Sequence, residues 1–126
     1  MRAHTDPELV VRWLGPDGST IRNTHPRTLG RAIKPETAAE LTQMMEAVVQ
    51  GGTGTAAQIP GIQVAGKTGT AETSVPKVYN AWFVCFAPAD HPRYAVGVVL
   101  EKQLNGFGGS VSAPIAKQVL EGLLGR

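Results

Sequence analysis

Three features that would narrow the function quickly are almost missing from this sequence. It has a single cysteine among 126 residues, so neither an internal disulfide nor a cysteine-based zinc cluster can form. Its twelve lysines and arginines exceed its ten acidic residues by only two, which indicates no nucleic-acid partner and no polybasic membrane patch. No run approaches the roughly 18 consecutive apolar residues of a transmembrane helix. A chain of 126 residues is long enough for one domain, so the sequence predicts one domain or part of one.

The residues capable of metal binding or nucleophilic attack are scattered. Cys85 lies in the apolar segment 81–86, which favours a buried structural thiol, because a reactive cysteine needs an electropositive and partly open site. His4, His25 and His91 stand in polar surroundings without the i, i+4 spacing of a helical metal site. We therefore expect neither a metal site nor a cofactor.

Two segments have the apolar periodicity of helices. Segment 35–50 begins with a proline and is followed by two glycines that would stop a helix. Segment 112–124 carries an early proline at a position where the missing N–H does no harm. The apolar positions expected to face the core are Leu41, Met44, Met45, Val48 and Val49 in the first helix and Ile115, Val119, Leu120, Leu123 and Leu124 in the second.

Between these helices lie three segments typical of β-strands, at 62–72, 80–88 and 93–101. Short turn sequences at 74–77 and 90–93 connect them, which predicts an antiparallel three-strand meander. The second strand is apolar on both faces, so we expect the sheet to be covered on both sides. The fold class is therefore α+β, an antiparallel sheet covered by the two helices.

The beginning of the chain lacks this pattern. Residues 9–14 and 20–23 flank a turn rich in glycine and proline, which predicts a β-hairpin, and an irregular connector follows. We expect a single incomplete domain in which the hairpin and connector occupy 1–34 and a helix–sheet–helix core occupies 35–126.

The stretch GIQVAGKTGT, residues 61–70, admits two interpretations. Its first eight residues match the phosphate-binding pattern G-x-x-x-x-G-K-[ST], which requires a helix directly after Lys67. The following residues are β-branched, interrupted by a glycine and closed by Pro76, so they form a poor helix. The sequence therefore argues against a nucleotide-binding loop.

An extended strand explains the same residues better. Gly66 and Gly69 would remove side chains where another backbone or a ligand must approach. Lys67 would present an ammonium group, while Thr68 and Thr70 would present hydroxyls and the Thr70 N–H could donate outward. Such an edge suits an extended ligand that ends in a carboxylate.

Several runs together resemble a known family. GGTGTAAQIPGIQVAGKTGTAE, followed by AWFVCFAPAD, RYAVGVVLE and the terminal helix, is similar to the C-terminal part of the transpeptidase domain of class B penicillin-binding proteins. The similarity extends over essentially the whole chain, and among the members it is greatest to an actinobacterial type. It implies a serine β-lactamase/transpeptidase-like fold.

The resemblance also implies roles for individual residues. In such proteins a serine attacks the D-alanyl-D-alanine end of a peptidoglycan stem peptide, and β-lactams acylate the same serine. Lys67 would belong to the catalytic proton and electrostatic network. Thr68 and Thr70 would hold the terminal carboxylate, the Thr70 N–H would be an oxyanion donor, and Gly69 would permit close approach.

Two further motifs of that family, S-x-x-K and S-x-N, do not precede Lys67. The tetrapeptide Ser74-Val75-Pro76-Lys77 matches S-x-x-K formally, but it carries a proline and falls in a short loop, whereas the motif needs one helical turn. We therefore expect a transpeptidase fragment that has the Lys-Thr-Gly strand, lacks the nucleophile and is inactive alone.

Two alternatives remain open: a non-catalytic module that binds D-alanyl-D-alanine or other carboxylates, and a fragment of a β-lactamase or β-lactam sensor. The expected partners are the stem peptide and β-lactams in the intact domain, the missing N-terminal part of that domain, and a second copy through exposed edges. The resemblance implies a parent protein anchored in the cell membrane with an extracytoplasmic domain.

Overall fold

The computed structural model describes residues 4–5, 12–23, 25, 28–30 and 32–126. The chain divides into two compact units, Met1–Ala38 and Ala39–Arg126. Each unit has its own antiparallel β-structure, and the candidate site lies entirely in the second unit.

The first unit contains two short strand pairs. β1 (His4–Thr5) pairs with β4 (Thr28–Gly30), and β2 (Arg12–Leu14) pairs with β3 (Thr20–Asn23). In the turn between β2 and β3, Gly18 has a positive φ of 78°, which a tight turn requires and glycine adopts readily. The predicted hairpin is thus confirmed where the structure describes it, while its residues 9–11 lie outside the described part. The connector after it is not irregular throughout, because β4 lies within it.

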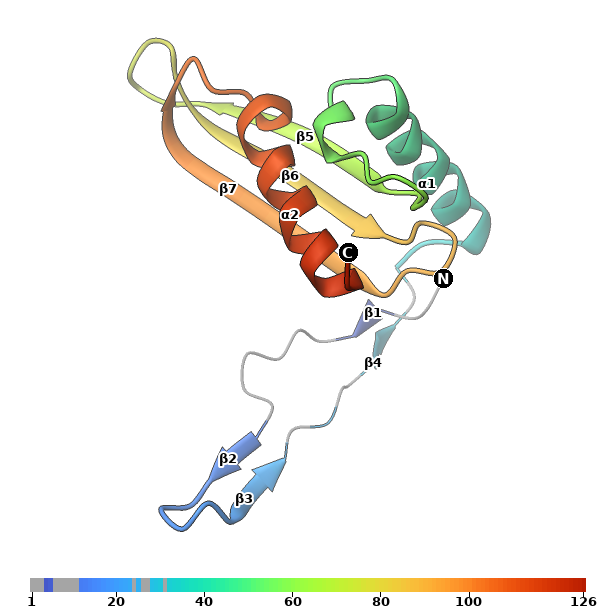
Figure 1. The fold of residues 1–126 in the computed structure, drawn as a ribbon, viewed down its shortest axis with the longest axis vertical. Coiled ribbons are helices and arrows are strands. Elements are labelled where there is room, and N and C mark those ends of the chain that lie inside the picture. Colours follow the sequence, from blue (N-terminus) through green and yellow to red (C-terminus); the bar gives the residue numbers. More distant parts are fainter. Residues whose placement is uncertain (1–3, 6–11, 24, 26–27, 31) are drawn as a thin grey trace. The chain divides into compact units, whose positions relative to one another are not determined.

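The second unit is built on a three-stranded antiparallel sheet in the order β5-β6-β7 (Figure 1). Its elements are α1 (Pro35–Gln50, which begins in the first unit), η1 (Thr55–Ala57), β5 (Ala65–Glu72), β6 (Val78–Ala87), β7 (Tyr94–Leu104), η2 (Gly108–Ser112) and α2 (Ala113–Leu124). The predicted α+β fold and meander are confirmed. β5 begins three residues later than expected, because Ile59 and Ile62 form a β-bridge that turns the chain just before it.

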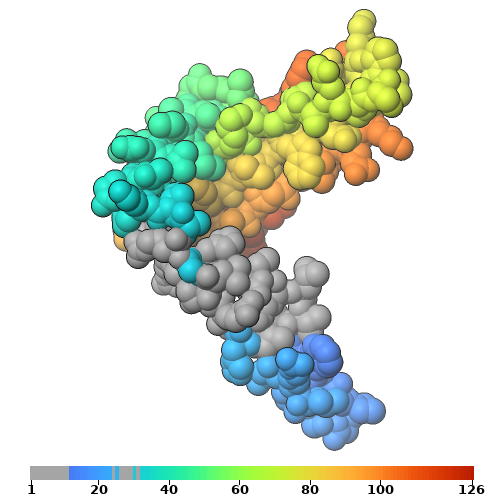
Figure 2. All heavy atoms as spheres, turned by 180° about the vertical axis from the view of Figure 1, so that it is seen from behind, coloured from blue at the N-terminus to red at the C-terminus, as the bar shows by residue number. Residues whose placement is uncertain are grey.

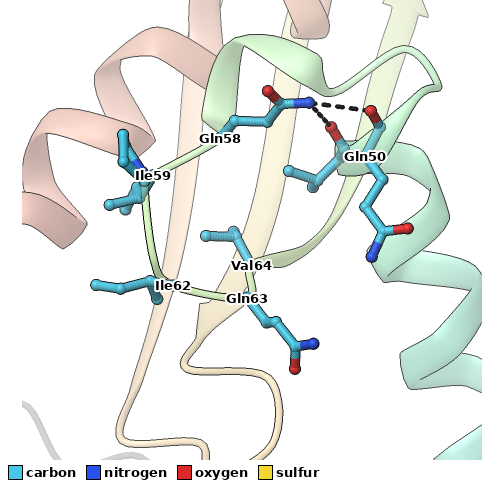
Figure 3. A pocket seen from close by; sticks show the side chains of 8 residues that line it. Gln50, Gln58, Ile59, Ile62, Gln63 and Val64 are labelled. Carbon is cyan, nitrogen blue, oxygen red and sulfur yellow. Dashed lines mark hydrogen bonds between the residues drawn. The ribbon is translucent and has the colours of Figure 1, made fainter.

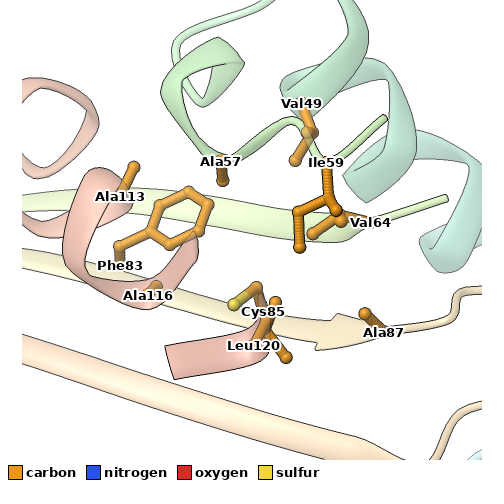
Figure 4. Packing of buried hydrophobic residues seen from close by; sticks show 10 residues of the cluster. All are labelled: Val49, Ala57, Ile59, Val64, Phe83, Cys85, Ala87, Ala113, Ala116 and Leu120. Carbon is orange, nitrogen blue, oxygen red and sulfur yellow. The ribbon is translucent and has the colours of Figure 1, made fainter. Parts of the chain in front are cut away.

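One face of the sheet carries the hydrophobic core. Side chains from β6 point toward α2, and α1 and η1 complete the same layer beside β5 (Figure 4). Phe83 and Leu120 are fully buried at its centre. The buried members of the cluster are Val49, Ala57, Ile59, Val64, Phe83, Cys85, Ala87, Ala113, Ala116 and Leu120.

The opposite face of the sheet is open in the described residues, which corrects the expectation that both sides are covered. Burial alternates along β6, and Trp82 and Val84 are each 45% exposed. Val99, the partner of Trp82 on β7, is 40% exposed. Figure 2, which views the molecule from behind, shows the yellow β6 and orange β7 at the surface there. We call Trp82, Val84 and Val99 the open apolar face.

The helices also bury less than the apolar pattern predicts. Leu41 and Met44 of α1 are 45% and 62% exposed, so the expected core-facing role of both residues is wrong. On α2 the buried residues are Ala113, Ala116 and Leu120. The predicted core positions Ile115, Val119 and Leu123 are exposed. On each helix the apolar residues therefore cover a wider face than the part that packs against the sheet in this chain.

Candidate active-site strand

Strand β5 carries all four residues singled out in the sequence. Lys67, Thr68, Gly69 and Thr70 lie in consecutive positions on it, and β6 pairs with only one of its two edges. The strand continues to Glu72 with no helix after the lysine. The phosphate-loop interpretation is therefore excluded, because that loop needs a helix N-terminus at this point.

The strand alternation separates the lysine from the threonines. Lys67 lies opposite Val84 and so shares the open apolar face, whereas Thr68 lies opposite Phe83 and shares the helix-covered face with Thr70. The Lys67 Nζ donates a hydrogen bond of 2.6 Å to the carbonyl oxygen of Thr68. The ammonium group thus lies against the backbone of β5, next to the residues with which it was expected to act.

Thr68 has a hydroxyl partner that the sequence analysis missed. Its Oγ1 lies 2.7 Å from Oγ1 of Thr53, which belongs to the bend between α1 and η1. Thr53 was included in the glycine-rich bend of the family resemblance but was given no role. The two threonines are fifteen positions apart in the sequence, so no local pattern predicts their contact. The only signal was a threonine placed among glycines.

The segment η2 packs onto β5 and β6 beside the threonines. A Cβ atom on Gly108 would overlap the carbonyl oxygen of Trp82, and one on Gly109 would overlap that of Thr53. The fully buried Ser112 donates from its hydroxyl to the carbonyl oxygen of Ala81 at 2.8 Å. These contacts hold the β7–α2 connection against β5 and β6, beside the part of β5 that carries the Lys-Thr-Gly sequence.

The two strand glycines make room for protein side chains. A Cβ atom on Gly66 would lie 2.6 Å from Phe83 Cζ and 3.2 Å from Val49 Cγ2. A Cβ atom on Gly69 would lie 3.2 Å from Trp82 Cβ. Both glycines therefore have a packing reason within this chain, whatever ligand approaches the strand.

The formal S-x-x-K match lies in the turn between β5 and β6, as expected. Lys77 has a positive φ of 64°, and Thr73 Oγ1 donates a hydrogen bond of 2.7 Å to the carbonyl oxygen of Val78 across the turn. The backbone from Ser74 to Lys77 is therefore not helical, and it does not stack the lysine on the serine as one helical turn would.

Neither the cysteine nor any metal-ligand cluster among the described residues offers a second site. Cys85 is buried, and desolvation raises the pKa of its thiol to about 11, so it is a poor nucleophile. Among the residues that the structure describes, no group of three or more His, Cys, Asp or Glu could hold a metal ion. A pocket of about 320 Å³ lies between the end of α1 and residues 58–64, and it includes none of the four β5 residues (Figure 3).

This architecture matches part of the transpeptidase domains of solved penicillin-binding proteins. The structure superimposes with a TM-score of 0.83 on the ceftriaxone acyl-enzyme complex of penicillin-binding protein A from Mycobacterium tuberculosis, at 37% sequence identity over 93% of this chain. It also matches the D,D-transpeptidase domain of a peptidoglycan glycosyltransferase from Eggerthella lenta, with a TM-score of 0.77 and 38% identity over 91% of this chain. The matched regions are 27% and 26% of those chains.

The sequence comparison gives the family directly. Residues 3–121 match the model of the penicillin-binding protein transpeptidase domain, and the chain belongs to that family. It is 39% identical over 127 residues to the peptidoglycan D,D-transpeptidase PbpA of Mycobacterium tuberculosis, and 36% identical over 137 residues to the penicillin-binding protein PbpB of Mycolicibacterium smegmatis. These alignments cover 94% and 95% of this chain but only 25% and 21% of the relatives.

Proposed function

We propose that this chain supplies the Lys-Thr-Gly wall of a peptidoglycan D,D-transpeptidase site. The observation that carries the proposal is the arrangement on β5: Thr68 and Thr70 on one face of an edge strand, with the Lys67 ammonium at the Thr68 carbonyl. Two hydroxyls and a nearby ammonium suit the terminal carboxylate of an extended peptide such as a D-alanyl-D-alanine stem.

The backbone of β5 supports a role for the Thr70 N–H as oxyanion donor. In a strand the N–H and C=O of alternate residues point to the same edge, so Thr70 shares the edge of Thr68. The Thr68 carbonyl accepts from Lys67, which favours placing that edge away from β6. Gly69 between them leaves the approach free of a side chain. An oxyanion donor of this kind contributes about 3 kcal/mol to the transition state.

The nucleophile would come from polypeptide outside these 126 residues. No S-x-x-K or S-x-N precedes Lys67, and the S-x-x-K match after it is a strand turn. Lys67 shares a sheet face with Trp82 and Val84, which are exposed here. We infer that the remainder of the transpeptidase domain covers this open apolar face and places its serine near Lys67. The chain alone would then be inactive.

The relatives support a ligand class for the intact domain. Penicillin-binding protein A of Mycobacterium tuberculosis has been solved as acyl-enzyme complexes with ceftriaxone and imipenem, which supports β-lactams as ligands of the intact domain here.

We also propose that the parent protein is anchored in the membrane with this domain outside the cytoplasm. Among the described residues, no helix is long and apolar enough to cross a bilayer.

The carboxylate site is tested by titrating the ¹⁵N-labelled chain with a D-alanyl-D-alanine-ended peptide and recording amide shifts. We expect saturable shifts at Thr68–Thr70, and a loss of affinity of about tenfold in Lys67→Ala, because a charge-assisted hydrogen bond is removed. Lys117→Ala on α2 is the matched control, since that lysine pairs with Glu121 instead. Flat shifts in the wild-type chain would contradict the proposal.

A second arm separates the transpeptidase fragment from a catalytic module. The chain incubated with a fluorescent penicillin should carry no label after denaturation, because it has no activated serine. Stoichiometric labelling that disappears in Ser74→Ala would show that the β5–β6 turn acts as a nucleophile. Peptide binding without labelling is the result that the proposed function requires.

A further inference from the structure

We infer that Thr53 is a positioning residue that directs the hydroxyl proton of Thr68 toward the ligand carboxylate. The inference rests on the proposed function, since it concerns the same carboxylate site. It adds a residue from a separate segment, the bend between α1 and η1, to a site otherwise built on one strand.

Each threonine hydroxyl carries a single proton that it can donate. The Oγ1 atoms of Thr53 and Thr68 are 2.7 Å apart, a full hydrogen bond in which one of them donates. If Thr68 donated to Thr53, it would offer only lone pairs to an approaching carboxylate and would repel it. If Thr53 donates, the Thr68 proton is free to point outward. A carboxylate ligand therefore selects the second arrangement, and each hydrogen bond strengthens the other.

The position of Thr53 is fixed by its neighbours. The N–H groups of Gly52 and Gly54 both donate to the carbonyl oxygen of Val48 at the end of α1, at 3.2 Å and 2.9 Å. Gly109 of η2 packs on the carbonyl of Thr53 so closely that a Cβ atom would not fit. The bend thus holds the threonine side chain in place before any ligand arrives, which reduces the entropy lost on binding.

Thr68 is held from two sides. A Cβ atom built on Gly109 lies 3.4 Å from Thr68 Cγ2, so the methyl group of Thr68 faces η2, while its hydroxyl faces Thr53. A β-branched side chain has few allowed rotamers, and these two neighbours select one of them. Removing the Thr53 hydroxyl removes one of the two constraints and also the donor that sets the direction of the proton.

The test compares Thr53→Val, which keeps the shape but not the hydroxyl, with Thr53→Ser, which keeps the hydroxyl. Each chain is titrated with a D-alanyl-D-alanine-ended peptide and with its C-terminal carboxamide. The wild-type chain should prefer the carboxylate, Thr53→Val should reduce this preference about fivefold, and Thr53→Ser should restore it. Thr55→Val is the matched control on the exposed start of η1.

A preference for the carboxylate that is equal in wild type and Thr53→Val overturns the inference while leaving the proposed function intact. Absence of wild-type binding contradicts the proposed function, and a ligand-free measurement then decides the inference. Scalar couplings to the Thr68 methyl group report its χ1 rotamer. One rotamer in wild type and Thr53→Ser, with averaging in Thr53→Val, supports the positioning role, and an unchanged rotamer in Thr53→Val overturns it.

Discussion

Gly66 shows how a single missing side chain permits the packing of the core against β5. Phe83 and Val49 occupy the space where a Cβ atom would be, and Phe83 is fully buried, so it cannot move away freely. We expect Gly66→Ala to lower the free energy of unfolding by about 1–3 kcal/mol through overpacking. Chemical denaturation followed by tryptophan fluorescence measures the change.

Gly122 provides the control at the same scale. It lies inside α2, and no atom lies within 4 Å of the place where its Cβ would be. Gly122→Ala should therefore stabilise the chain by about 0.5–1 kcal/mol, because alanine is the better helix former. Equal effects of the two substitutions would show that crowding by Phe83 does not explain Gly66.

At the scale of elements, Gln58 holds the end of α1. Its Nε2 donates to the carbonyl oxygens of Val49 and Gln50 at 2.9 Å and 3.0 Å, two groups that a helix C-terminus leaves without a partner (Figure 3). Gln58→Ala should lower the free energy of unfolding by about 1–2 kcal/mol and increase amide exchange in the last turn of α1. Hydrogen exchange by mass spectrometry measures the local effect.

Gln63, which lines the same pocket as Gln58, provides the control for this prediction. Gln63 is exposed, and its side chain points away from the α1 terminus in Figure 3. We expect Gln63→Ala to leave both stability and exchange within the error of the measurement. If Gln63→Ala loosens α1 as much as Gln58→Ala does, the pocket lining rather than the cap would be responsible.

At the scale of the whole molecule, the open apolar face predicts association. Trp82, Val84 and Val99 form a contiguous exposed set across β6 and β7, and the outer edge of β5 is unpaired in the described residues. We expect the isolated chain to self-associate with rising concentration, and Trp82→Thr to shift it toward monomer. Multi-angle light scattering over a concentration series measures the mass.

The control for this surface is Val75→Thr in the β5–β6 turn, where a similarly exposed valine stands away from the sheet face. It should leave the association unchanged. A wild-type chain that stays monomeric at every concentration would show that the open face is tolerated in water. In that case the proposed covering by the rest of the domain would lose its physical support.

The regular elements were predictable because their signals are local. The three- and four-residue spacing between Pro35 and Gln50, with glycines after it, places α1 to the residue. Turn chemistry at 74–77 and 90–93 sets the meander. The choice between a strand and a phosphate loop for 61–70 was also local, because it depended on whether the following residues could form a helix.

What could not be predicted depends on contacts between distant segments. Apolar periodicity marks Met44 and Val119 as core positions, yet burial depends on whether a partner lies against them, and the described part of the chain supplies none. Likewise the apolar strand β6 was expected to be covered on both faces. The sequence shows which residues are hydrophobic, whereas only the folded structure shows which segments bury them.

Residue types in a fixed local order were enough to predict the α+β class, the strand that carries Lys67, Thr68 and Thr70, and the family. The remaining features came only from the folded structure. It placed Lys67 on the open face and the threonines on the other, and it brought Thr53 to Thr68 across fifteen residues. Strand pairing and packing fix these positions, and neither can be read from neighbours along the chain.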